Sequence, residues 1–425
     1  MRAVISGGGL SALSNAVQLL RMGASVTLIS PAEPSFWPGF TGLWSPSLRV
    51  LRDLDILSEV ESKGAHLGTR TQGYKSWQQR DTRSWLMRPQ EGLSQSPDSP
   101  SLLFVDNSHL LSVLSKKMRA VGRISSLTEK RGIVAVVDAQ ENEVHLDNGI
   151  RVPYDVLIGA DGSSSAVRKS LAAGGETSAP FLRYRGYTVF RGLVTQQEVD
   201  KRFRPASAEL LREQAWQTFG PGSRFAVVPT PGGGYCWFFA VTATAPNAAG
   251  RPGGGPSSPD RPFQNDTRTA SKEALASLAS LAASFHEPTL ELVQHTPAGN
   301  VTACPAYSSS VHAVQASALP PNVFLTGDAR CTLDPILAVG AGLAIEDSKH
   351  LVTALQSGPL SSCGARLDAL RVPRLRRLSL LSSAAQLVGH VESASLCSVR
   401  DAVLSSLPSP LLGVVLDGVI RKLAQ

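Results

Sequence analysis

The fold is decided by residues 2–30, which read R-A-V-I-S-G-G-G-L-S-A-L-S-N-A-V-Q-L-L-R-M-G-A-S-V-T-L-I-S. The stretch opens with a short apolar run and continues with three glycines at 7–9. Apolar residues then recur at helical spacing over 10–20, and Gly23 ends this helix before an alternating, β-branched run at 25–29. A strand, glycine turn, helix and strand within about 30 residues predict a right-handed βαβ unit with parallel strands.

The glycine turn, G-G-G-L-S-A, fits the dinucleotide pattern G-x-G-x-x-A. Gly7 permits the tight turn, Gly9 lets the backbone approach a pyrophosphate, and Ala12 lets helix and strand pack closely. The helix N-terminus would hold the diphosphate through its free N–H groups and its dipole. An acidic residue normally ends the second strand and binds the ribose hydroxyls. Here Ser30 stands at that place, with Glu33 as an alternative three residues on.

The rest of the chain predicts a second, β-rich unit and a helical end. Helical patterns cover residues 45–63 and 108–119, a hairpin covers 132–149, and a buried strand covers 155–158. Aromatic, β-rich sequence from 181 to 245 predicts a largely antiparallel sheet, followed by a helix at 271–285, a core strand at 322–326 and a long apolar helix. The last sixty residues are expected to be helical with breaks at Pro373, Pro408 and Pro410.

These patterns divide the chain into three segments. They are an α/β nucleotide-binding segment at 1–175, a β-sheet substrate segment at 176–300 and a third segment at 301–425. Residues 247–262 are rich in Gly, Pro and Ser and predict a disordered surface loop. Residues 411–423 are amphipathic; packing on the body is favoured, and peripheral membrane contact stays open as the alternative.

The composition narrows the classes of partner. The 425 residues carry a net charge of +7, and the densest basic stretch, Arg371 to Arg377, predicts a solvated helix face rather than a nucleic-acid stripe. The five cysteines form no C-x-x-C pair, which favours a reducing compartment, the cytoplasm. The histidines lack metal-ligand spacing, so no metal site is expected. No transmembrane span is expected either, and the first strand starts at residue 2, leaving no room for a leader.

Two further motifs follow predicted strands: D-V-L-I-G-A-D-G-S-S-S-A-V-R at 155–168 and V-F-L-T-G-D-A-R-C-T-L-D-P-I-L-A-V-G-A-G-L-A-I-E-D at 323–347. A third stretch, T-G-L-W-S-P-S-L-R-V-L, occupies 41–51. Together with the glycine turn, these resemble the class A flavoprotein monooxygenases, the para-hydroxybenzoate and salicylate hydroxylase-like family. The matches extend from residue 4 to residue 347 in the family's order.

The resemblance implies a Rossmann-like FAD-binding domain with a parallel sheet, an antiparallel β-sheet substrate domain and a helical C-terminus. It also implies an oxidoreductase in which NAD(P)H, as a transient co-substrate, reduces bound FAD. The reduced flavin then uses O2 to hydroxylate or epoxidise a small aromatic or lipophilic substrate. The protein shields the reacting centre from water and presents the substrate.

The resemblance also implies where FAD binds. Asp328 would hydrogen-bond the ribityl chain, Gly42 would line the cofactor path, and the D-G motif would contact FAD and NAD(P)H with Arg168 fixing its loop. The residues implied to bind cofactor, including those of the glycine turn, are Gly7, Gly9, Ala12, Ser30, Gly42, Asn107, Asp161, Gly162, Asp328, Gly340, Ala341 and Gly342. The last three would place backbone N–H groups at a helix N-terminus beside the flavin ring.

The sequence departs from the family at three places. The family's G-D-A-A-H-P reads G-D-A-R-C-T at 327–332, and the arginine of its R-x-x-L helix start is Asn107 here. With Ser30, two charged contacts to FAD are missing, each worth about 1.5–3 kcal/mol, so weaker flavin binding is expected.

Arg191 is the candidate catalytic residue. It falls where some family members place an arginine that keeps a phenolate ionised and electron-rich. The family's tyrosine before proline is replaced by Val228 before Pro229, and a cross-strand surface arginine is the alternative interpretation.

Two other functions stay open. Asp334-Pro335 is similar to the D-P of flavin-dependent halogenases and prenyl reductases, although the halogenase motif W-x-W-x-I-P is absent. The departures from the family pattern favour, as the other alternative, a degenerate flavoprotein that acts as a binding module.

Overall fold

The computed structural model describes residues 1–31, 39–67, 72–77, 102–122, 126–172, 181–213, 215–243, 268–270 and 272–406. The predicted loop at 247–262, the amphipathic segment at 411–423 and Glu33 lie outside these residues.

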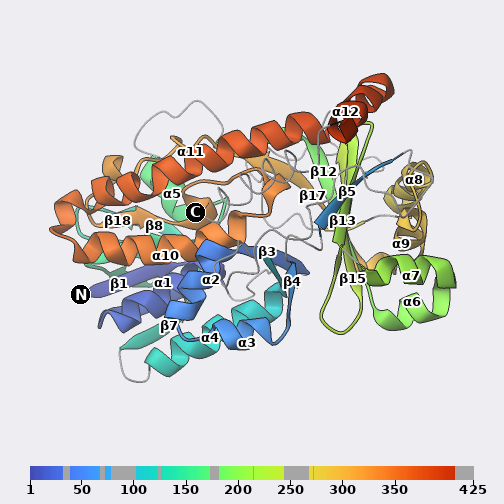
Figure 1. Ribbon diagram of the computed structural model, residues 1–425. Helices are drawn as coiled ribbons and strands as arrows, with labels where there is room; N and C mark the ends of the chain where they lie inside the picture. Colours follow the sequence, from blue (N-terminus) through green and yellow to red (C-terminus); the bar gives the residue numbers. More distant parts are fainter. Residues whose placement is uncertain are drawn as a thin grey trace.

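A five-stranded parallel sheet forms the first unit, in the order β18-β11-β1-β2-β7 (Figure 1). Its strands are β1 (Arg2–Ser6), β2 (Ser25–Ser30), β7 (Leu127–Arg131), β11 (Val156–Gly159) and β18 (Val323–Leu325). Helix α1 (Leu10–Arg21) connects β1 to β2, which run parallel with Arg2 beside Ser25 and Ser6 beside Ile29. The predicted βαβ unit is confirmed.

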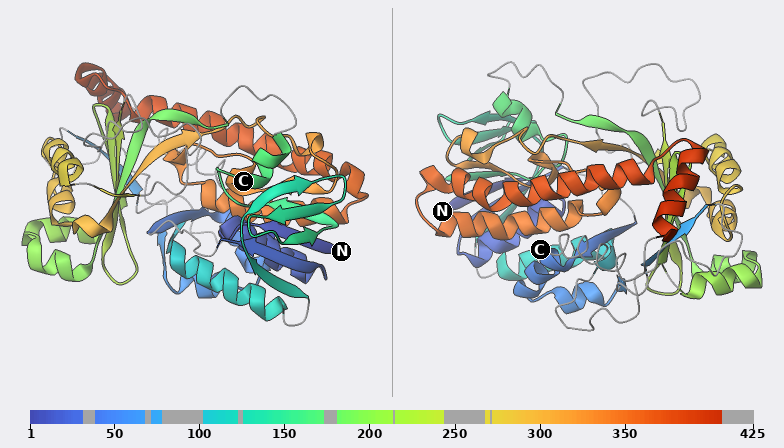
Figure 2. Two further views of the ribbon diagram at one scale, coloured as in Figure 1. Left: turned by 180° about the vertical axis from the view of Figure 1, so that it is seen from behind. Right: turned by 45° about the horizontal axis from the view of Figure 1, so that its top comes forward.

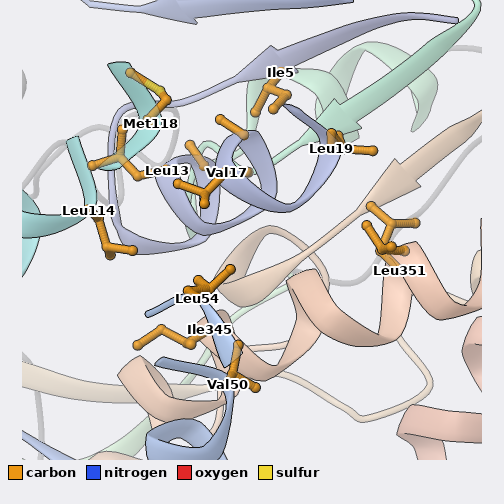
Figure 3. Close-up of a cluster of buried hydrophobic side chains, with 14 of the residues drawn as sticks. Ile5, Leu13, Val17, Leu19, Val50, Leu54, Leu114, Met118, Ile345 and Leu351 are labelled. Carbon is orange, nitrogen blue, oxygen red and sulfur yellow. The ribbon is translucent and has the colours of Figure 1, made fainter. Parts of the chain in front are cut away.

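Alternate residues of the central strand enter different cores. Ala3 and Ile5 of β1 pack with α1, α4 (Asn107–Gly122) and α10 (Gly340–Gln356), as the side chains from Leu13 to Leu351 in Figure 3 show. Val4 points to the other face, where a small antiparallel sheet and α5 (Ala166–Ala172) cover it. That sheet consists of β8 (Val134–Asp138), β9 (Glu143–Leu146) and β10 (Arg151–Pro153), and β8 and β9 form the predicted hairpin. Each fully buried aliphatic side chain adds about 1.5–3 kcal/mol to the stability of the folded state.

A seven-stranded sheet forms the second unit, in the order β16-β17-β12-β15-β14-β13-β5. Its strands are β5 (Gln72–Ser76), β12 (Arg183–Val194), β13 (Ala215–Gly220), β14 (Ser223–Pro229), β15 (Tyr235–Thr242), β16 (Arg268–Thr269) and β17 (Val301–Ser308). The sheet is antiparallel, as predicted, except that β5 pairs in parallel with β13. β17 extends it past the predicted segment boundary at residue 300.

Helices cover one face of this sheet, and the parallel-sheet unit lies beyond the other (Figures 1 and 2). The covering helices are α6 (Gln196–Arg202), α7 (Pro205–Glu213), α8 (Lys272–Ala282) and α9 (Thr289–His295). Trp237 and Phe239 pack under these helices, whereas Phe238 packs on the opposite face. The strand period of two explains this division.

A third, three-stranded sheet lies between the two units in the order β3-β6-β4, from Phe40–Trp44, Leu102–Asp106 and Gly64–Leu67. The predicted helix over 45–63 is two helices, α2 (Ser45–Asp53) and α3 (Leu57–Glu61). Asp55 separates them in the left-handed conformation, with φ of 56°, which an α-helix does not tolerate.

Two C-terminal helices, α11 (Cys363–Gly389) and α12 (Ala394–Ser406), follow, and α11 runs from the parallel sheet to the substrate sheet (Figure 2). The predicted break at Pro373 is wrong, because α11 continues through it. The solvated face predicted for Arg371 to Arg377 is also wrong in part. Arg371 and Arg374 are buried because Glu346 of α10 pairs with both, at 3.3 and 2.7 Å.

Within the described ranges, no helix combines the length and the apolar character that a membrane crossing requires.

Candidate functional site

The sequence motifs converge at the carboxyl edge of the parallel sheet. Gly7 follows β1, Ser30 ends β2, Asp161 follows β11, and Asp328 follows β18. These strands are neighbours in the sheet, although their motifs are up to about 300 residues apart in the chain. Ligands of open parallel sheets bind outside this edge, at the point where strand connections diverge.

The two glycines of the first turn do different work. Gly7 has a φ of +131°, and a Cβ there would lie 2.3 Å from the carbonyl oxygen of Ala160. Gly9 has ordinary extended dihedrals, and a Cβ there would meet nothing within 4 Å. Ala12 is fully buried in the core between α1 and the sheet. Gly7 therefore lets β1 and β11 turn close together, whereas Gly9 opens a space above the helix.

Two helices point uncapped N-termini at this edge. Among the described residues, no side chain caps the first turn of α1 or of α10, and neither turn contains an acidic residue. A Cβ on Gly340 would meet nothing within 4 Å, whereas Gly342 packs 3.1 Å from Ser47 Oγ. Free N–H groups at such ends, together with the helix dipole, favour an anionic ligand.

Gly42 and Ala341 border the second of these N-termini. A Cβ on Gly42 would lie 2.9 Å from Leu102 Cδ1 and 3.4 Å from Ala338 Cβ, so glycine lets β3 approach the loop before α10. Ala341 lies in the first turn of α10 and packs partly against the core of the parallel sheet.

A basic residue accompanies the missing acid at the end of β2. Arg131 of β7 donates from Nη1 to Ser30 Oγ at 3.1 Å and to the carbonyl oxygen of Pro31 at 3.2 Å. The parallel register that sets Ser30 beside Arg131 brings the two side chains together. The serine hydroxyl is therefore already bonded to a cation. The sequence did not predict this contact, because it does not show that β7 pairs with β2.

The D-G motif starts a helix and braces the G-D turn. Asp161 Oδ2 accepts from the N–H groups of Ala166 and Val167 at 2.9 and 3.2 Å, while its buried Oδ1 has no partner among the described residues. Gly162 has a φ of +78°. Arg168 donates to the carbonyl oxygens of Ser163 and Ala329, the latter at 2.7 Å, and thus joins the two motif loops.

Asp328 lies in a turn held by the first helix and by α10. The side chain of Thr326 is 2.9 Å from Ser11 Oγ and accepts from Asn15 at 3.0 Å, and the N–H of Gly327 donates to Asp347 Oδ2 at 2.7 Å. The Asp328 side chain reaches solvent although protein surrounds most of it. This burial raises its pKa to about 6; the charge of Asp347 adds to the rise, and Arg168 opposes it.

The other two departures, Asn107 and Arg330, are buried and have partners inside the protein. Asn107 starts α4, is 8% exposed, and donates its N–H to the carbonyl oxygen of Gly39 at 2.9 Å. Arg330 is buried and pairs with Asp368 of α11 at 2.6 Å. The cation of Arg330 therefore serves the packing of α11 and does not replace the charge lost at position 107.

Arg191 lies on the face of the substrate sheet that looks toward the parallel-sheet unit. It stands opposite Phe238 on β15, 5.6 Å from the ring centroid. The Phe238 ring meets Phe104 edge-on at 5.7 Å, and Phe104 stacks on Phe40 at 6.4 Å. Burial lowers the pKa of Arg191. The alternative of a surface arginine is wrong, because β12 turns this side chain inward to an aromatic wall.

No family model matches the chain. Over 274 residues it is 30% identical to aurachin C monooxygenase/isomerase of Stigmatella aurantiaca. This alignment covers 63% of this chain and 60% of the relative. Over 303 residues it is 28% identical to 3-amino-4-hydroxybenzoate 2-monooxygenase of Streptomyces cremeus. This alignment covers 71% of this chain and 65% of the relative. The chain thus spans about three fifths of the length of these relatives.

The whole fold matches solved structures. Klebsiella pneumoniae HpxO complexed with FAD and uric acid superposes with a TM-score of 0.74 at 20% identity, over 99% of this chain and 97% of that one. For 2,6-dihydroxypyridine-3-hydroxylase from Arthrobacter nicotinovorans the TM-score is 0.70 at 18% identity, over 92% and 93%. This chain is a homologue of the class A flavoprotein monooxygenases. The predicted architecture of this family, a parallel-sheet unit, a separate β-sheet unit and C-terminal helices, is confirmed.

Proposed function

We propose that the protein is an FAD-dependent monooxygenase that uses NAD(P)H and O2 to hydroxylate or epoxidise a small aromatic or lipophilic substrate. One observation carries this proposal: three family motifs meet at one sheet edge beside two uncapped helix N-termini. The relatives support it, since they are named as monooxygenases of an aurachin and of an aminohydroxybenzoate, and one more distant relative is the zeaxanthin epoxidase of tomato.

The residues at this edge fit FAD. The open space at Gly9 and the N-terminus of α1 would receive the diphosphate, Asp328 would accept hydrogen bonds from the ribityl hydroxyls, and Ser30 and Asn107 would lie along the remainder of the cofactor. The first turn of α10, from Gly340 to Gly342, would face the ring system. When bound, the flavin would pass electrons from NAD(P)H to O2.

The protein's own groups would then orient the substrate. The N-terminal dipole of α10 stabilises negative charge near its first turn. The Arg191 guanidinium favours the ionised form of an acidic substrate group, such as a phenol, placed against it. The apolar side chains around Phe238, among them Leu333 and Val339, would exclude water from this space. Some family members place a tyrosine before the proline that corresponds to Pro229. Val228 stands there in this chain and has no hydroxyl to bond a phenol substrate, so the match to those members is incomplete.

An absorption spectrum of the purified protein tests the proposal first. A yellow protein with flavin bands that consumes NAD(P)H faster when an aromatic or polyene substrate is added would support it. Flavin bands without such stimulation would favour a halogenase or prenyl reductase. A colourless protein that gains no flavin when FAD is added would favour the binding module, which the Ser30–Arg131 contact also makes a candidate.

The division into segments at 1–175, 176–300 and 301–425 remains part of this proposal. We also propose that the protein acts in a reducing compartment such as the cytoplasm, because all five cysteines are free thiols.

A further inference from the structure

The loop that leads into α10 is held by side chains from the substrate sheet and from the three-stranded sheet. It comprises residues 334–339, with a short 3-10 turn, η5, at Pro335–Leu337 and Ala338 in the left-handed conformation at φ of 52°. Arg224 of β14 donates to the carbonyl oxygen of Ile336 at 3.4 Å. Trp44 donates from Nε1 to the carbonyl oxygen of Leu337 at 3.2 Å.

Asp334 makes the strongest of these connections. Its side chain is 3% exposed, and both oxygens have donors. Arg185 donates to Oδ2 at 2.9 Å, while the Tyr187 hydroxyl and the N–H of Ile336, the latter at 3.0 Å, donate to Oδ1. A buried carboxylate is stable only when it is paired and hydrogen-bonded in this way.

The two side chains that hold Asp334 come from the strand that carries Arg191. Tyr187 and Arg191 are four residues apart on β12, so their side chains share one face of the sheet, about 13 Å apart along the strand. α11 backs this end of the strand, since Gln386 donates to the carbonyl oxygen of Arg185 at 2.6 Å. The His390 ring lies 4.4 Å from the Tyr187 ring.

We propose that Asp334 is a positioning residue that sets the distance between Arg191 and the N-terminus of α10. This inference rests on the proposed function, in which Arg191 orients the substrate and α10 faces the flavin. Asp334 connects the two elements: its carboxylate is hydrogen-bonded to side chains of β12, and its backbone starts the loop that leads to Gly340. A misplacement of about 1 Å between reacting groups can cost about a hundredfold in rate. By holding the loop to β12, Asp334 would keep the substrate aligned with the flavin.

Asp334→Asn is the test variant. The amide keeps the size of the side chain but has only one acceptor oxygen, so in either orientation its NH2 group meets a donor, either the Arg185 guanidinium or the N–H of Ile336. Tyr187→Phe removes one donor and leaves the ring beside His390. The matched control is Glu291→Gln: this buried carboxylate also accepts from an arginine side chain, a hydroxyl and a backbone N–H, those of Arg204 and Ser207, but lies on the helix-covered face of the sheet.

Hydrogen exchange of the apoprotein gives a readout that needs no cofactor. We expect amides of residues 336–343 to exchange at least tenfold faster in Asp334→Asn and several-fold faster in Tyr187→Phe, with the core strand β1 unchanged. In the FAD-loaded enzyme, Asp334→Asn should raise the substrate KM and divert NAD(P)H electrons to hydrogen peroxide, while FAD affinity stays within threefold. Glu291→Gln should change neither the exchange of this loop nor the yield of product per NAD(P)H.

Unchanged hydrogen exchange of residues 336–343 in both Asp334→Asn and Tyr187→Phe would overturn the proposal. An equal increase in the exchange of this loop in Glu291→Gln would overturn it too. So would an unaltered product yield in Asp334→Asn. Failure of the proposed function looks different: the parent protein would then bind no FAD, while the exchange data on the apoprotein would still decide whether Asp334 holds the loop.

Discussion

Gly9→Val should abolish tight FAD binding and leave the apoprotein folded. Gly9 has φ of −88° and ψ of −169°, a region that β-branched residues favour, and a Cβ there meets no protein atom within 4 Å. Replacing glycine at an unstrained position even removes disorder from the unfolded chain, worth about 0.4–1 kcal/mol. The cost of the substitution therefore falls on the ligand and not on the fold.

The size of the effect follows from what the side chain displaces. If valine pushes the diphosphate off the N-terminus of α1, about two charge-assisted hydrogen bonds of about 1.5–3 kcal/mol each are lost. A loss of about 3–6 kcal/mol corresponds to a Kd for FAD about 10²- to 10⁴-fold higher. Titration of apoprotein with FAD, followed by quenching of flavin fluorescence, measures this directly, and thermal melting of the apoprotein measures the fold.

Two other glycines serve as controls. Gly299 is also open, with nothing within 4 Å, and lies in the substrate unit, so Gly299→Val should change neither measurement. Gly7→Ala places a Cβ 2.3 Å from the Ala160 carbonyl at a φ of +131°, which costs about 2–6 kcal/mol of stability from strain and overpacking. A Gly9→Val protein that binds FAD within threefold of the parent would refute the reasoning, and so would one that unfolds as Gly7→Ala does.

Three further outcomes are expected. Asp328→Asn should weaken FAD binding; because the folded-state pKa of Asp328 is raised to about 6, the parent apoprotein loses stability as pH rises from about 4 through 6, and the variant should not, as melting curves across that range would show. Arg371→Met should cost about 3–5 kcal/mol in chemical denaturation, since it removes the arginine that pairs with the buried Asp347 and leaves Glu346 with Arg374; a loss below 1 kcal/mol would contradict this role. Ser30→Glu should tighten FAD binding up to about tenfold, because a carboxylate accepts stronger hydrogen bonds from ribose hydroxyls than serine does; equal or weaker binding by titration would show that Arg131 pairs with the new carboxylate instead.

The candidate site was predictable as far as it depends on local pattern. The glycine turn, the D-G step and the G-D step each follow an apolar strand, and the resemblance to the flavoprotein family implied that Gly7, Asp161 and Asp328 bind one cofactor. Their meeting at one edge follows from the parallel pairing of these strands in the structure. The resemblance also implied free backbone N–H groups at the helix that starts at Gly340, and the structure shows that start of α10 without a side-chain cap. The partner of Ser30 was not, because Arg131 lies 101 residues away on a strand whose place in the sheet the pattern does not show.

The sequence by itself determined the βαβ unit, the order of the motifs and the division between a parallel and a largely antiparallel sheet. Periodicity and turn residues act over a few positions, and that is the range of information a pattern carries. Only the tertiary structure decided that Arg191 faces inward and that Arg371 lies in a buried ion pair. It also decided that Asp334 joins β12, since Tyr187 and Asp334 are 147 residues apart in the chain. Charges read as solvated in a sequence can be buried when a distant helix supplies the opposite charge, and no local pattern records that partner.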